Sequence, residues 1–82
     1  MHLAYVLYNL ERDKWHYGCT SNEDLKKVEN AHNKGIIDDT KGPGTWTMMY
    51  HEKCNSQSYA IRRIRFFRSV AGQRFLKRIL NY

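Results

Sequence analysis

The pattern of apolar and polar positions along the chain predicts three strands. Residues 3–10, with the sequence LAYVLYNL, are rich in aliphatic and aromatic side chains and predict a strand that ends at the polar turn ERDK. Residues 15–20, WHYGCT, form a second β-prone run, so the two runs together predict a hairpin. Residues 45–53, TWTMMYHEK, predict a third strand that begins near Trp46.

A first helix is predicted after the hairpin. Ser21 or Asn22 can cap it, because short polar side chains accept hydrogen bonds from the free N–H groups of a first turn. Gly35 can end it, since glycine readily adopts the left-handed conformation found beyond many helix ends. Residues 36–45 hold the single proline between two glycines and predict a loop. The apolar positions of the helix are Leu25, Val28 and Ala31.

The clearest helical pattern lies in the last third of the chain. At about 100° per residue, residues 58–71 have one apolar face, and Ile64 lies on it and is expected to point inward. No carboxylate is interleaved with the arginines of this segment, although such pairs would reduce their mutual repulsion. The apolar face comprises Ala60, Ile61, Ile64, Phe67 and Ala71, with Arg62 and Arg65 opposite and Arg63 and Arg68 on its flanks.

A short final helix completes the predicted elements. Gly72 is expected to end the preceding helix, and residues 73–80 then bury Phe75, Leu76, Ile79 and Leu80. The order β-β-α-β-α-α predicts an α+β fold, a small three-stranded antiparallel sheet with helices packed on it. A chain of 82 residues has room for one core, so residues 1–82 are predicted to form a single domain.

Charge is distributed unevenly along the chain. Residues 1–52 carry six Lys and Arg against eight Asp and Glu, a net charge of −2, whereas residues 53–82 carry eight Lys and Arg and no acid. Such a cationic segment favours an anionic partner, and nucleic acid, with DNA favoured, is the expected one because phosphate contacts supply most non-specific affinity. The alternative interpretation is a basic face that only keeps the protein soluble.

Cysteines, histidines and targeting signals restrict the function further. Cys19 and Cys54 have no CxxC spacing and are interpreted as small core residues, while the four histidines are scattered, so no metal site is predicted from them. No apolar run is long enough to cross a bilayer, and the N-terminus lacks the features of a signal peptide. We therefore expect a cytoplasmic protein without a membrane partner.

Several motifs occur in the order found in a nuclease family. The first predicted strand contains the motif "LAY", whose last residue is Tyr5. The second contains "HYG", with His16 and Gly18, and the sequence "CTSN" follows it directly. The helix "DLKKVENAHN" precedes "GPGTWTMMYHEK", and "SQSYAIRRIRFFRSVAGQRFLKRIL" closes the chain. This ordered set resembles the GIY-YIG nuclease family, in its small stand-alone branch related to excision-repair and intron-homing nucleases.

The resemblance implies a phosphodiesterase site in which two groups have been replaced. In the family a glutamate holds a divalent cation, a tyrosine helps to activate water and an arginine stabilises the developing charge. Here Val28 stands at the arginine and Ile64 at the glutamate, and neither can ligate a metal or supply charge. If each lost group contributed about 3–4 kcal/mol to the transition state, hydrolysis would be slower by roughly 10⁴-fold or more. No cofactor is therefore expected, and Mg²⁺ or Mn²⁺ only if activity survives.

Surviving activity would need substitute groups. The candidate catalytic residues are then Tyr5, His16 as a general base and Lys27 as a contact to phosphate. A replacement metal ligand would come from Glu52, Glu23 or Glu29. Tyr17 alternates with His16 along the strand and is interpreted as a core aromatic.

Three functions follow from these observations. The first is a nucleic-acid-binding domain without hydrolytic activity, in which Phe66 could stack on a base or could instead pack against the last helix. The second is a divergent but active endonuclease, and the third is a protein-interaction module built on a former nuclease. The predicted nucleic-acid contacts are Arg62, Arg63, Arg65, Arg68, Arg74, Lys77 and Arg78.

Overall fold

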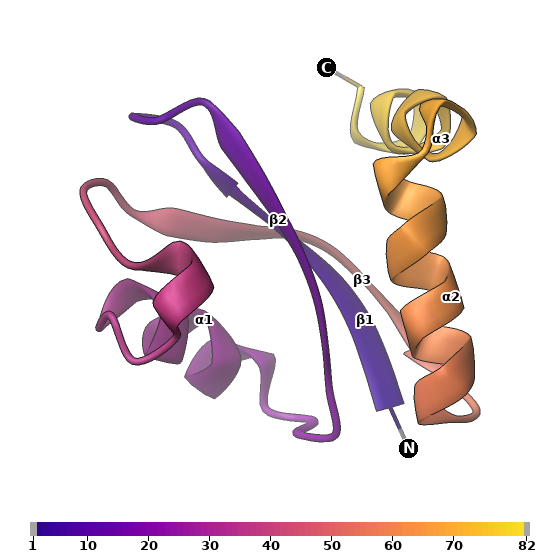
Figure 1. The fold of residues 1–82 in the computed structure, drawn as a ribbon, viewed down its shortest axis with the longest axis horizontal. Helices are drawn as coiled ribbons and strands as arrows, with labels where there is room; N and C mark the ends of the chain where they lie inside the picture. The colour runs from indigo at the N-terminus through magenta and orange to yellow at the C-terminus, as the bar shows by residue number, and fades with distance from the viewer. Residues whose placement is uncertain (1, 82) are drawn as a thin grey trace.

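A three-stranded antiparallel sheet lies between two layers of helix. In the computed structural model, which describes residues 2–81, the sheet has the order β2-β1-β3 with β1 in the centre. Figure 1 shows α1 on one side of the sheet and α2 with α3 on the other. The predicted α+β class and the element order are confirmed. The elements are β1 (His2–Asn9), β2 (Lys14–Thr20), α1 (Leu25–Asn33), η1 (Asp38–Thr40), β3 (Trp46–Cys54), α2 (Gln57–Arg68) and α3 (Val70–Leu80).

The two faces of the sheet bury different side chains, because successive residues of a strand point to opposite sides. On the α2 and α3 side the buried cluster is built on Ala4 and Val6 of β1, and on the α1 side it is built on Tyr5 and Leu7. The first cluster is completed by Cys54, Ala60, Phe67 and Leu76, and the second by Trp46. Both cysteines are free, and Cys54 is buried as expected for a core residue, whereas Cys19 is half-buried.

Helix α1 is attached to the outer edge of β3 by side chains. The Asn33 amide accepts from the Trp46 N–H at 2.6 Å and donates to the Trp46 carbonyl at 3.0 Å. The Glu29 carboxylate accepts from the Met48 N–H at 2.7 Å. These bonds satisfy backbone groups that an edge strand would otherwise leave unpaired.

The boundaries of α1 differ from the prediction at one end. Asp24 caps the helix by accepting from the Lys27 N–H, whereas Asn22 accepts from the Asp24 N–H one turn earlier. Asn22 therefore lies in the turn before the helix and is not its N-cap. Gly35 follows the helix with a φ of +76°, as expected for a terminator. The predicted loop 36–45 also contains a short 3-10 turn.

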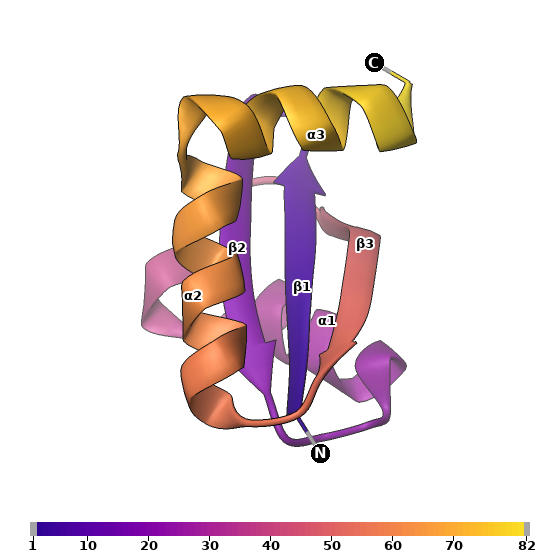
Figure 2. The same cartoon turned by 90° about the vertical axis from the view of Figure 1, so that its right-hand side faces the viewer.

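The helical segment divides at Ser69, not at Gly72. Ser69 has extended backbone, its hydroxyl donates to the Phe66 carbonyl, and the same hydroxyl accepts from the Gly72 N–H. One residue thus ends α2 and caps α3. Figure 2 shows α2 alongside the strands and α3 across their end. Among the helices within residues 2–81, none is long and apolar enough to span a bilayer.

The buried face of α2 is rotated from the predicted apolar face. Ala60 and Phe67 are buried and Ile64 is half-buried, but Ile61 is 38% exposed. Ala71, predicted to share this face, lies in α3 and is exposed. The rotation places Arg63 toward the core, where its side chain is only 23% exposed.

Candidate functional site

A cavity of about 250 Å³ opens beside Tyr5 on the α1 side of the sheet. The end of β2, the segment after it, α1 and the chain before η1 together form its walls. Two of the predicted catalytic residues, Tyr5 and Lys27, line it. The lining residues are Tyr5, Cys19, Thr20, Asn22, Lys27, Val28, Ala31, His32 and Ile37.

Gly18 fixes the position of the Tyr5 ring. The two residues are directly opposite each other in the β1–β2 ladder. A Cβ atom at Gly18 would lie 2.6 Å from both Cζ and the hydroxyl oxygen of Tyr5. The ring therefore lies across the glycine, and a larger residue there would displace it.

The Tyr5 hydroxyl belongs to a buried chain of hydrogen bonds. It lies 2.8 Å from Nε2 of His32, whose Nδ1 lies 2.8 Å from the Thr40 hydroxyl. Thr40 donates in turn to the Ile37 carbonyl at 3.3 Å. This direction makes Nδ1 of His32 the donor to Thr40 and leaves Nε2 to accept the proton of Tyr5.

Both members of the Tyr5–His32 pair are neutral near pH 7. Burial raises the pKa of Tyr5 to about 12. Burial, together with neighbouring His16, lowers the pKa of His32 to about 4. Tyr5 is therefore a phenol that donates its proton to a neutral imidazole, and only the transfer of that proton to His32 would let it act as a base.

His16 lies next to this pair. Its ring centroid is 4.9 Å from that of His32 and 6.3 Å from that of Tyr5. Burial lowers the pKa of His16, the charge of Asp39 opposes that shift, and the charge of Arg68 adds to it. Arg68, at the end of α2, thus acts electrostatically on the Tyr5 side from the other side of the sheet.

His32 is a site residue that the sequence analysis missed. The four histidines were treated as scattered, but the fold brings His16 and His32 together. A signal was present, since His32 follows Val28 by four residues and so lies on the same face of α1. By contrast, Tyr17 faces the other side, where its hydroxyl accepts from Gln73 and its ring packs near Phe67, as predicted for a core aromatic.

Val28 and Ile64, which the resemblance aligns with the family's arginine and glutamate, lie on opposite faces of the sheet. Val28 packs against the cluster of Tyr5, Leu7 and Trp46. Ile64 belongs to α2, which packs on Ala4 and Val6, so it lies across the sheet from the face that Tyr5 occupies.

The three acids considered as substitute metal ligands either bind other protein groups or line a different cavity. Glu52 binds Arg63 and accepts from Tyr50, while Glu29 binds the Met48 N–H and Lys26. Glu23 lies beside a separate cavity with His51. Within the described part of the chain, no group of three His, Cys, Asp or Glu side chains is arranged to hold a metal ion.

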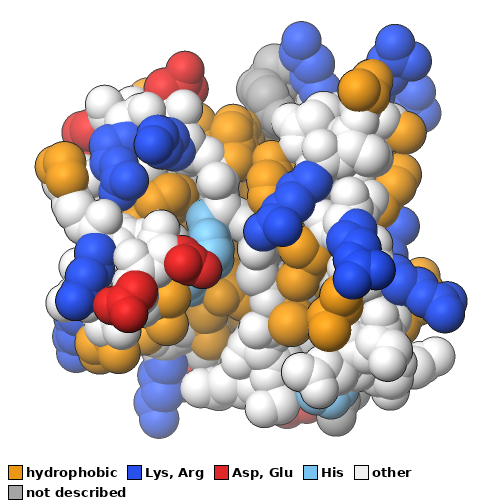
Figure 3. Space-filling view, in the orientation of Figure 1, with side chains coloured by type: hydrophobic (Ala, Val, Ile, Leu, Met, Phe, Trp, Pro, Cys, Tyr) orange, Lys and Arg blue, Asp and Glu red, His pale blue; other side chains and the backbone are white. Residues whose placement is uncertain are grey.

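Exposed cations cover the outer surfaces of α2 and α3. Figure 3 shows Lys and Arg side chains on both halves of the molecule, and the visible acidic side chains lie mainly on the half with α1. Among residues 2–81 these side chains form no ion pairs, since the ion pairs found there use Lys26, Lys41 and Arg63. The exposed cations, called here the basic surface, are Arg62, Arg65, Arg68, Arg74, Lys77 and Arg78.

The side chains of Arg63 and Phe66 pack within the fold and do not belong to the basic surface. The Arg63 guanidinium donates to both carboxylate oxygens of Glu52, at 2.5 and 3.2 Å, and lies over the Phe66, Phe67 and Phe75 rings. Phe66 is half-buried with its ring centroid 5.7 Å from that of Phe75. The packing alternative for Phe66 therefore holds, and Arg63, predicted as a phosphate contact, is already neutralised within the fold.

Comparisons with models of protein families, with curated proteins and with solved structures found no match to this chain. The GIY-YIG resemblance thus stays a prediction from the sequence motifs.

The buried His32 makes the free energy of unfolding depend on pH. The folded pKa of about 4 lies below the usual 6.5, so between these values the unfolded chain binds a proton that the folded chain excludes. This contribution to stability is fully present above about pH 6.5, and the free energy of unfolding should decrease by about 3 kcal/mol as the pH falls to about 4. Urea unfolding at several pH values measures this decrease.

The His32→Gln variant isolates this contribution. It should lose that part of the pH dependence, while His51→Gln, at an exposed position on β3, should retain it. NMR titration of the His32 ring gives the same pKa directly. An identical stability profile for wild type and His32→Gln would contradict the assignment.

Proposed function

We propose that this chain is a nucleic-acid-binding domain on a GIY-YIG-like scaffold that has lost metal-dependent phosphodiester hydrolysis. The observation that carries the proposal is the basic surface of α2 and α3, six exposed cations on two helices that contain no acidic residue. Among residues 2–81 none of these six cations takes part in an ion pair, and Glu52, which binds α2, is paired with Arg63.

The geometry of the basic surface suits a strand that follows both helices. Arg68 is the last residue of α2 and Arg74 lies in the first half of α3, so these two cations flank the junction. Contacts of this kind go to the phosphates and favour affinity over sequence recognition. We favour DNA as the ligand.

Reversing charge on the basic surface should remove most of the binding. Arg62→Glu with Arg65→Glu should weaken affinity for a fluorescent DNA duplex at least about tenfold and reduce the slope of log K against log salt by about 2. Fluorescence anisotropy at several salt concentrations measures both quantities, and RNA and single-stranded DNA serve as further ligands.

A matched double variant controls for total charge. Lys14→Glu with Lys34→Glu changes the net charge equally but lies at exposed positions outside α2 and α3. Equal losses in the two double variants would refute a localised interface. If the wild type retains no nucleic acid even at low salt, the third function, a protein-interaction module, takes its place.

One observation favours the second candidate, an endonuclease with an altered site. Tyr5, hydrogen-bonded to His32, lies in a cavity that Lys27 also lines. In such a site the Tyr5 oxygen could accept a proton from attacking water while its own proton passes to Nε2 of His32. Lys27 would contact the phosphate.

We expect this reaction to be absent, because the substituted positions hold only Val28 and Ile64. Supercoiled plasmid incubated with the protein and Mg²⁺ or Mn²⁺ should stay intact over hours. Metal-dependent nicking that Tyr5→Phe abolishes would establish the endonuclease instead. Nicking that persists in Tyr5→Phe would indicate a contaminating enzyme.

A further inference from the structure

A cavity of about 260 Å³ lies at the end of the sheet where β1 begins. It is on the α1 side of the sheet, because Leu3 precedes Tyr5 by two residues on the same strand and points the same way. The volume is below the range of about 300–1,000 Å³ typical of sites for drug-sized ligands, so the cavity suits a small molecule. The lining residues are Leu3, Glu23, Leu25, His51 and Lys53.

Two segments of the chain carry the polar walls of this cavity. Lys53 is directly opposite Leu3 in the β1–β3 ladder, and His51, two residues earlier on β3, points to the same side. Glu23 lies in the segment between β2 and α1, and Leu25 is the first residue of α1. The strand therefore supplies an ammonium and an imidazole group, and the chain that enters α1 supplies a carboxylate.

The polar side chains of this cavity have no protein partners in the described part of the chain. Glu23, His51 and Lys53 make no side-chain hydrogen bond or ion pair there. Glu23 and Lys53 thus carry opposite charges and line one cavity without contacting each other. A small ligand that carries both charges can contact the two walls at once through charge-assisted hydrogen bonds.

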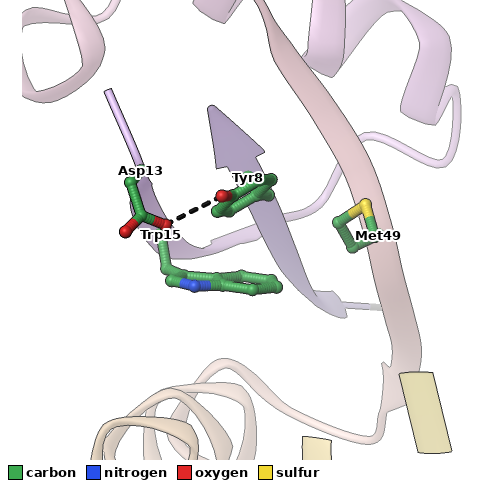
Figure 4. Close-up of a pocket in the computed structure, with 4 residues that line it drawn as sticks. All are labelled: Tyr8, Asp13, Trp15 and Met49. Atoms are coloured by element: carbon green, nitrogen blue, oxygen red, sulfur yellow. Dashed lines mark hydrogen bonds between the residues drawn. The ribbon is translucent and has the colours of Figure 1, made fainter. Parts of the chain in front are cut away.

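The cavity at the hairpin end of the sheet differs in this respect. Figure 4 shows its lining residues, Tyr8, Asp13, Trp15 and Met49, and the hydrogen bond in which the Asp13 carboxylate accepts from the Tyr8 hydroxyl at 2.8 Å. The acid of that cavity is already bound within the protein, and its lining includes no Lys or Arg. Opposite charges without protein partners distinguish the cavity beside Leu3 from it.

We propose that the cavity beside Leu3 binds a free α-amino acid with an aliphatic side chain. The Glu23 carboxylate accepts from the ligand's ammonium group, and Lys53 with His51 donates to its carboxylate. The aliphatic side chain lies against Leu3 and Leu25, where burial stabilises it by about 25 cal/mol per Å² of apolar surface. Glu23 repels a simple anion and Lys53 repels a simple cation, so a zwitterion matches the cavity best.

NMR titration with leucine tests the proposal directly. The backbone amides of Leu3 and Lys53 and the methyl groups of Leu25 should shift with a dissociation constant of about 1 mM, as expected for a small ligand in a partly exposed site. Glycine lacks the aliphatic side chain and should bind at least about tenfold more weakly. The Arg62→Glu and Arg65→Glu double variant should bind leucine as the wild type does, so this test is independent of the basic surface.

Two analogues and two variants assign each charged contact. Leucinamide lacks the carboxylate and N-acetylleucine lacks the ammonium group, so each should bind about tenfold more weakly than leucine. Lys53→Gln should lose the preference for leucine over leucinamide, and Glu23→Gln should lose the preference for leucine over N-acetylleucine. Lys34→Gln and Glu11→Gln are the matched controls at exposed positions away from the cavity, and both should keep the affinity and the two preferences.

Glu23 and Lys53 are exposed, so both variants should fold as the wild type does, and circular dichroism checks this. The proposal is overturned if leucine shifts none of the named resonances. It is also overturned if either analogue binds as tightly as leucine, or if Glu23→Gln and Lys53→Gln bind leucine as tightly as the wild type.

Discussion

Replacing Gly72 with alanine should destabilise the protein by about 3 kcal/mol, the high end of the range for overpacked sites. Helix propensity alone would predict that Gly72→Ala stabilises the protein, since alanine is favoured over glycine inside a helix by about 1 kcal/mol. A Cβ atom at Gly72 would lie 1.7 Å from the Phe66 carbonyl oxygen and 2.4 Å from its carbon. These are backbone atoms at the end of α2, so relief requires the two helices to separate.

Ala71→Ser is the matched control, because Ala71 is exposed in the same turn of α3. It should change the free energy of unfolding by less than about 0.7 kcal/mol. Urea unfolding followed by circular dichroism measures both variants. A Gly72→Ala protein as stable as the wild type, or more so, would show that the α2–α3 junction can open without cost.

The same junction shows where sequence reasoning about the elements stops. The β-prone runs and the helical periodicity were sufficient for the fold class and for the approximate positions of the three strands and of α1, α2 and α3, but not for the short η1. Gly72 was interpreted as a terminator because glycine is common after helices. In the structure it is required by a close approach between two helices, and Ser69 makes the break with its hydroxyl. Only the tertiary arrangement distinguishes these roles.

The candidate site was predictable in part for a similar reason. Tyr5, His16 and Lys27 were identified from motif positions, and the structure brings them to one side of the sheet around the cavity and the adjacent histidine ring. The partner of Tyr5 was not identified, because the hydrogen bond to His32 joins residues 27 positions apart. Such a contact depends on how α1 packs on β1, which local patterns do not specify.

Arg63 illustrates how composition can mislead about a surface. Every arginine of the cationic segment was assigned to phosphate, yet the rotation of α2 carries one of them inward over three aromatic rings. That arginine binds Glu52, the last acid in the chain. The segment therefore uses one of its cations to attach α2 to β3 and exposes the others.

Glu52→Gln should therefore destabilise the protein by about 3 kcal/mol, although it removes only one charge. The Glu52 and Arg63 side chains are 18% and 23% exposed, so the guanidinium would be left without a counter-charge in a largely dry site. Glutamine can still accept from the Tyr50 hydroxyl, which now donates to Glu52 at 2.8 Å. The loss thus reports mainly on the ion pair.

A double-mutant cycle with Arg63→Met separates the pair from its surroundings. The two single variants should each be destabilised, and the double variant should be more stable than their sum predicts by about 2 kcal/mol. Asp38→Asn with Lys41→Met, at an exposed pair, should show coupling below about 0.5 kcal/mol. Arg63→Met should also bind DNA nearly as wild type, unlike the Arg62 and Arg65 reversal. Coupling near zero would show that the Glu52–Arg63 pair does not stabilise the fold. A large loss of DNA binding in Arg63→Met would place Arg63 on the nucleic-acid surface after all.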